Sequence, residues 1–145
     1  MSGFTDVYVL SAKRSKADVL RFLDRFLPAR TELAEEYPVP QYAERPQACF
    51  DTAEQLLDHL HAHPDQAHAV YWASVSPGDP RYAMVFPTVD GQMVYGLSVE
   101  RDGRKFLADL KVHLESSKGY IDFENPPPDN AADFEAVAAD LGSSR

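Results

Sequence analysis

Four of the five histidines lie close together, at positions 59, 61, 63 and 68. His59 and His63 are four residues apart in a segment that we predict to be helical, so their side chains share one face. This spacing can hold two ligands of a zinc or nickel ion. The segment lacks both the tight Cys/His pattern of structural zinc sites and the glutamate of a zinc-protease helix. We therefore expect a polar helix face that happens to use histidine, and we expect neither a metal nor a cofactor on His59, His61 or His63.

Cys49 is the single cysteine of the chain. It could act as a nucleophile, or as a further metal ligand, if a histidine met it in space. Nothing near it in the sequence favours this, and a free cysteine most often behaves as a small buried hydrophobe. The chain also has no phosphate-cradling glycine loop, no dinucleotide fingerprint and no GxSxG elbow. We expect no catalytic residue.

A group of acidic and tyrosine residues follows the first predicted helix. Residues 32–66 carry eight acidic residues and one arginine, a net charge of −7 within a chain of net charge −9. Glu32 and Glu36 would align on a helix, but aligned like charges normally mark a solvated face rather than an acid/base pair. Carboxylates attract a basic partner, and tyrosines supply rigid contact area. We expect the partner-binding residues to be Glu32, Glu35, Glu36, Tyr37 and Tyr42.

Length and composition limit the classes of protein to consider. The chain has 145 residues, of which 44% are hydrophobic, so residues 1–145 are predicted to form a single domain. The net negative charge argues against general nucleic-acid binding. No apolar run is long enough for a membrane span, and the first residues do not resemble a signal peptide. Together with the lone cysteine, this predicts a cytoplasmic protein without membrane association.

Local patterns predict the order of the elements. A strand at residues 6–11 precedes a helix at 16–27 that begins at a capping box on Ser15. Residues 29–50 are irregular, with a short helical turn expected at 31–36, and a helix spans 52–63. Three strands follow at 69–75, 82–89 and 92–100, the last two joined at Asp90-Gly91. Pro87 indicates an edge strand or a bulge, because proline cannot donate to a ladder.

The remainder of the chain completes an α+β domain. A helix at 104–116, a strand at 119–123 and a helix that begins at Asn130 are predicted, with a flexible tail at 142–145. We expect a mainly antiparallel sheet with about four helices packed on one face. Tyr71 and Trp72 must point to opposite faces of their strand, and we expect a helix of the same chain to cover the outward ring.

Four runs carry a resemblance: RFLDRFLP at 21–28, EYPVPQY at 36–42, AMVF at 83–86 and GYIDF at 119–123. They resemble small acidic bacterial proteins that are similar to the immunity proteins of polymorphic-toxin systems. The resemblance implies tight binding of a cognate toxin, with no catalytic residues and no particular fold.

Two alternatives stay open. One is a small enzyme or ligand-binding domain with a pocket between the sheet and residues 29–50, using Tyr42, Cys49, His59 and His63. The other is a homodimer joined through the strand that carries Pro87. The identity of the partner and the oligomeric state stay open as well.

Overall fold

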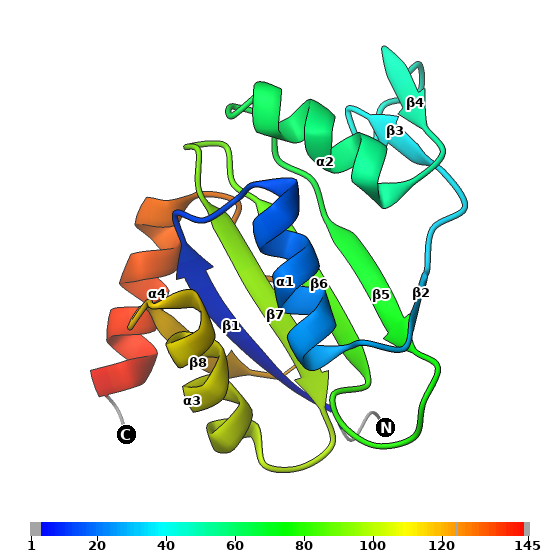
Figure 1. Ribbon diagram of the computed structural model, residues 1–145. Coiled ribbons are helices and arrows are strands. Elements are labelled where there is room, and N and C mark those ends of the chain that lie inside the picture. The colour runs from blue at the N-terminus through cyan, green and yellow to red at the C-terminus, as the bar shows by residue number, and fades with distance from the viewer. Residues whose placement is uncertain (1–3, 124, 144–145) are drawn as a thin grey trace.

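The computed structural model describes residues 4–123 and 125–143 of the chain. Its main feature is an antiparallel sheet of six strands in the order β2-β5-β6-β7-β1-β8 (Figure 1). A separate two-stranded sheet joins β3 and β4. The strands are β1 (Thr5–Ser11), β2 (Arg30–Glu32), β3 (Tyr37–Val39), β4 (Ala48–Phe50), β5 (Val70–Ser74), β6 (Tyr82–Pro87), β7 (Met93–Val99) and β8 (Gly119–Asp122). The helices are α1 (Lys16–Phe26), α2 (Ala53–Ala62), α3 (Gly103–Leu114) and α4 (Ala131–Ser143). The predicted α+β single domain is confirmed.

Strand β7 forms the centre of the sheet and is buried on both faces. Met93, Tyr95 and Leu97 point into the larger core, and Val94 points into the smaller core on the other face. This alternation is the one that the sequence predicts for a strand with a period of two. The two cores explain why an apolar residue occupies nearly every position of β7.

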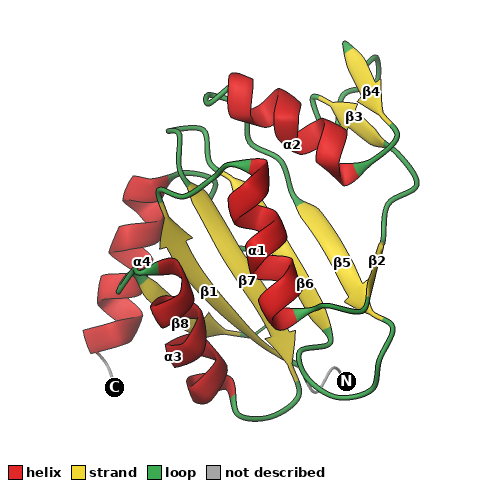
Figure 2. Ribbon diagram, viewed as in Figure 1, coloured by secondary structure: helices red, strands yellow, loops and turns green. Residues whose placement is uncertain are grey.

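Helices α1, α2 and α3 cover one face of the sheet (Figure 2). Helix α1 begins at the predicted capping box, in which the Ser15 hydroxyl accepts from Asp18 N and the Asp18 carboxylate accepts from Ser15 N. Its buried stripe includes Val19, Phe22 and Phe26, at the spacing expected of an amphipathic helix. The cap fixes the start of α1, and the stripe fixes which side faces the sheet.

Helix α4 lies on the opposite face, so the expectation that all helices pack on one face is wrong. It packs over β8 and β1, where Phe134 contacts Tyr120. Its first turn is held by Asn130, whose Oδ1 accepts from Asp133 N at 2.8 Å, as predicted. Asp90 in the β6–β7 turn accepts from Ala131 N at 2.8 and 2.9 Å. The bonds from Asp90 hold the first residue of α4 against the β6–β7 turn. The tail expected at 142–145 is helical as far as Ser143, and residues 144–145 lie outside the described residues.

Residues 29–50 are more regular than predicted. The helical turn expected at 31–36 is wrong, because Arg30–Glu32 pairs as strand β2 with Ser74–Trp72 of β5. Strands β3 and β4 then form a small hairpin above the main sheet. Short strands of three residues contain too few positions for a period to be detected in the sequence.

Pro87 ends strand β6, which is interior along most of its length but has an open edge at Pro87, as the proline predicts. Strand β6 pairs with β5 on one side and with β7 on the other. Pairing with β5 stops at Val70 and Val85, so no strand faces the Pro87 nitrogen on that side. A second copy of the chain could therefore not add a strand along residues 82–85 of β6 without displacing β5. Among the described residues, no helix has the length and apolar character needed to cross a membrane.

Candidate functional site

Some residues of the acidic segment are bonded within the fold, and others are only exposed to solvent. Tyr37 is only 2% exposed, and its hydroxyl donates to Glu32 Oε1 at 2.7 Å. The same oxygen accepts from Ala53 N at 2.8 Å, at the first residue of α2. Burial and the Glu32 carboxylate raise the pKa of Tyr37. Two of the five expected partner-binding residues therefore hold the fold together, and Glu35 and Glu36 remain exposed between β2 and β3.

Tyr42 is the most exposed aromatic residue described, at 87%. It lies in the loop between β3 and β4, beside Gln41. The Gln41 side chain donates to Ala69 O at 3.2 Å and accepts from Ala69 N at 2.9 Å, ahead of β5. This pair of bonds fixes the base of the loop against the main sheet. The Tyr42 ring thus projects into solvent from an anchored position.

His68 also holds the base of this loop against the main sheet. It is buried, and its two ring nitrogens lie 3.2 Å from Ala69 O and 3.1 Å from Pro38 O. Burial lowers the pKa of His68, although the two carbonyl groups favour the protonated ring. A neutral imidazole can donate to only one of these oxygens at a time. The side chain therefore ties β3 to the start of β5 and is not free to act on a ligand.

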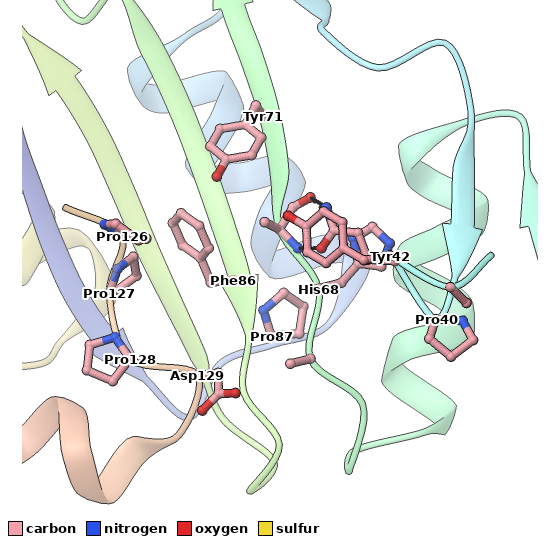
Figure 3. A pocket seen from close by; sticks show the side chains of 14 residues that line it. Pro40, Tyr42, His68, Tyr71, Phe86, Pro87, Pro126, Pro127, Pro128 and Asp129 are labelled. Atoms are coloured by element: carbon pink, nitrogen blue, oxygen red, sulfur yellow. Dashed lines mark hydrogen bonds between the residues drawn. The ribbon is translucent and has the colours of Figure 1, made fainter. Parts of the chain in front are cut away.

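A cavity of about 520 Å³ opens between this loop and the sheet (Figure 3). One wall is the 40–43 loop, and the opposite wall is the run Pro126–Pro128. Tyr71 and Phe86 lie between the walls, with their rings 5.8 Å apart and nearly perpendicular. Trp72 points into the core and Tyr71 outward at 38% exposure, as alternation predicts. No helical residue lines the cavity, so the expected helical cover over Tyr71 is wrong.

A second cavity of about 370 Å³ adjoins the first and shares Tyr71, Phe86 and Pro126 with it. At its base lies Asp6, which is 8% exposed and accepts a short hydrogen bond from the Ser98 hydroxyl. The two cavities lie on the part of the sheet face that α4 leaves uncovered. We call this surface the aromatic trough, and its ring and thioether side chains are those of Tyr8, Tyr42, Tyr71, Tyr82, Met84 and Phe86.

The residues considered for metal binding or nucleophilic chemistry do not converge. The rings of His59 and His63 stack at 4.1 Å, and His63 Nδ1 lies 2.7 Å from His59 O. His59 Nε2 lies 2.9 Å from Gln66 Oε1. Cys49 is exposed, and partial desolvation followed by the Glu36 carboxylate raises the pKa of its thiol. Across residues 4–123 and 125–143, no group of three or more His, Cys, Asp or Glu side chains could hold a metal ion.

Sequence reasoning identified Tyr42 and the outward ring of the Tyr71 and Trp72 pair, but it missed the other parts of the trough. The prolines at 126–128 indicate a strand end, and they also form a wall because the chain there crosses the sheet face. Asp6 could have been noticed in the sequence, because it is the one charged residue of strand β1 and lies at the alternating position that shares a face with Tyr8.

Comparison of the chain with protein-family models, with curated proteins and with solved structures finds no match. Function is therefore inferred from the surface itself.

Proposed function

We propose that this protein binds another protein through the aromatic trough and catalyses no reaction of its own. The observation that carries the proposal is the placement of Tyr42, which is 87% exposed at the rim of an open, largely apolar cavity next to Tyr71. Exposed apolar surfaces of this kind mark interaction sites, and tyrosines dominate the binding energy of many interfaces. Because Gln41 already fixes the loop, little conformational entropy is lost when a partner docks.

The exposed carboxylates in the chain segment that leads to Tyr42 favour a basic partner. Glu35 and Glu36 lie in the same excursion of the chain as Tyr42, and neither is buried. The whole chain carries a net charge of −9. Such a field accelerates the encounter with a basic protein and disfavours acidic ones.

The resemblance to immunity proteins supplies the identity of the partner within this proposal. A cognate bacterial toxin would occupy the trough, and its own active site or its movement would be blocked. The protein would act in the cytoplasm of the cell that makes the toxin. Support comes from the acidic surface, the exposed tyrosines and the four resembling runs of sequence.

A small-molecule site is the second candidate, and the position of the first cavity favours it. The cavity lies between the sheet and residues 40–43, and its volume falls in the range of known ligand pockets, roughly 300–1,000 Å³. Its polar side chains Gln41 and His68 are already bonded to backbone groups. A tightly held ligand, or a substrate turned over by the purified protein, would support this candidate over protein binding.

The test is co-expression with the protein encoded immediately upstream, with growth of the host as the measurement. We expect the wild-type chain to rescue growth and the Tyr42→Ser and Tyr71→Ser variants to lose most of the rescue. Val112→Ser is the matched control, because Val112 is 78% exposed on α3, which covers the other face of the sheet. Full rescue by both tyrosine variants, in soluble and folded form, contradicts binding through the trough.

A further inference from the structure

The register of the sheet places charged and aromatic residues in one row on the uncovered face. Asp6 of β1 lies opposite Ser98 of β7 on one side and opposite Asp122 of β8 on the other. Ser98 in turn lies opposite Tyr82 of β6. Directly opposed residues of antiparallel strands point to the same face, and like charges placed in this way repel each other. The row therefore runs from two carboxylates, through a hydroxyl, to an aromatic ring.

The second cavity of the trough lies over this row. Asp6, Ser98 and Tyr82 all line it, together with Tyr8 and Tyr71. Asp6 is more than nine-tenths buried, and the hydroxyl of Ser98 donates to its carboxylate. The cavity thus has a fixed acidic base and aromatic sides.

The charge of Asp6 affects the tyrosines that line this cavity. Burial first, and then the charge of Asp6, raises the pKa of Tyr8. Burial raises the pKa of Tyr71 as well, and Tyr42 and Asp6 add to the effect. Among residues 4–123 and 125–143, no lysine or arginine lines either cavity of the trough. The occupant that complements this surface is therefore a cation.

We propose that the second cavity of the trough receives an arginine side chain of the partner protein. This inference rests on the proposed protein-binding function and adds the chemistry of the contact. The guanidinium group would bind the Asp6 carboxylate and lie against the ring of Tyr71 or Tyr82. Arginine suits the cavity better than lysine, because its planar and weakly hydrated cation stacks on aromatic faces and pairs with carboxylates in the same plane.

The test uses three capped amino acids with the full chain, followed by amide chemical shifts in two-dimensional NMR. The probes are N-acetyl-arginine methylamide, the corresponding citrulline compound, which has nearly the same shape without the charge, and the lysine compound. We expect the arginine probe to shift amides around Asp6, Ser98 and Tyr82 and to bind at least about fivefold tighter than citrulline. Lysine should bind with intermediate affinity.

Two variants and one control locate the binding. Asp6→Asn keeps the size of the side chain and should abolish the preference for arginine over citrulline, and its spectrum reports directly whether it is folded. Tyr71→Leu, at a half-exposed position, keeps an apolar side chain and should weaken arginine binding about threefold or more. Asp58→Asn on α2 removes an equivalent charge from the helix-covered side of the sheet and should change nothing.

The possible results distinguish a failure of the arginine site from a failure of the proposed function. Equal affinity for arginine and citrulline, or shifts confined to residues outside the trough, overturns the arginine site and leaves protein binding through Tyr42 intact. Conversely, arginine binding that depends on Asp6, combined with full growth rescue by the Tyr42→Ser and Tyr71→Ser variants, supports the cation site and contradicts the proposed function.

Discussion

Arg14 is a buried cation held by backbone carbonyl groups. Its guanidinium donates to Leu60 O at 2.8 Å and to Gln92 O at 3.0 Å, with Thr88 O at 3.5 Å. Leu60 lies near the end of α2, and Thr88 and Gln92 flank the β6–β7 turn. One side chain thus joins the start of α1 to two elements distant in sequence. The carboxyl end of a helix favours a cation at that position.

Replacement of Arg14 by methionine should lower the free energy of unfolding by about 2–4 kcal/mol. The reason is that buried carbonyl groups would lose their donors while the apolar volume stays similar. Urea denaturation measures the change, and Arg104→Met on the exposed side of α3 is the control. A loss no greater than that of the control would mean that water replaces the guanidinium without cost.

Protonation of His68 should destabilise the fold at acid pH. Burial holds the pKa of His68 below that of the unfolded chain, about 6.5, so the unfolded state takes up a proton first as the pH falls. The stability present above that pH is therefore lost progressively below it. Urea midpoints at pH 7.5 and 5.5 should fall further apart in the wild-type chain than in His68→Gln. An identical pH dependence in both proteins would show that His68 is not the group responsible.

Single residues were predictable from sequence where their partners are local. Ser15 and Asn130 cap their helices by accepting a hydrogen bond from the backbone nitrogen three residues later. Such a short spacing can be recognised in the sequence. The role of Glu32 was not predictable, because its carboxylate binds Ala53 N across 21 positions. Composition suggested only a carboxylate that faces solvent. The contact with the first residue of α2 becomes visible only in the folded chain.

At the scale of elements, β1 is confined by two strands and allows little change near its ring Tyr8. A Cβ on Gly96 would lie 2.9 Å from Tyr8 Cδ1, and one on Gly119 would lie 2.7 Å from Tyr8 O. A side chain can shift more easily than the backbone of a strand that is paired on both sides, as β1 is. These two glycines on β7 and β8 therefore set the distance at which the strands pack around Tyr8.

Gly96→Ala should cost about 1–3 kcal/mol of unfolding free energy, and Gly119→Ala should cost more. The second change pushes on a carbonyl group of β1 and disturbs the β1–β8 pairing itself. Thermal and urea denaturation of both variants gives the order. If Gly96→Ala proves the more damaging, the backbone of β1 yields more readily than the buried Tyr8 ring.

Gln41→Ala should loosen the β3–β4 loop without unfolding the domain. The two bonds to Ala69 are lost, while the core that holds the sheet does not involve this side chain. Cleavage after Glu44 by a glutamyl endopeptidase should become at least about threefold faster at an almost unchanged melting temperature. Gln47→Ala, an exposed position in the same segment, is the control. Equal cleavage of the two variants would indicate that His68 alone anchors the loop.

Long elements were predictable and short ones were not. Each helix and long strand has enough apolar positions to display its period, so α1, α2 and the meander of β5, β6 and β7 were located within a few residues. Strands β2, β3 and β4 have three residues each and owe their conformation to pairing with other parts of the chain. The order of the strands was equally hidden, because β1 pairs with β7 and β8 at the far end of the sequence.

The whole molecule is asymmetric in both packing and charge. Three helices cover one face of the sheet, while α4 covers only part of the other, and this difference creates the trough. No local sequence pattern predicts on which face of the sheet α4 packs. The same holds for the path of the chain at Pro126–Pro128. The acidic segment was visible from composition, but the trough on the sheet face was not.

Charge reversal at Glu35 and Glu36 tests the contribution of the acidic segment. Both are exposed, so Glu35→Lys/Glu36→Lys should leave stability nearly unchanged. The association rate with the upstream-encoded partner should fall severalfold at low salt, and the effect should diminish as ionic strength rises. Rapid-mixing kinetics at two salt concentrations measures this. Unchanged rates would restrict the partner contact to the trough, even if growth rescue persists.

The position of β1 between β7 and β8 has a consequence for biosynthesis. During synthesis, β1 acquires its neighbours only after residues 93–99 and 119–122 have been translated and have left the exit tunnel. Until then its apolar residues have no native surface to pair with. Strand β1 must therefore wait without its native pairing while the later strands are made, and chaperones that shield nascent chains have a long opportunity to bind there.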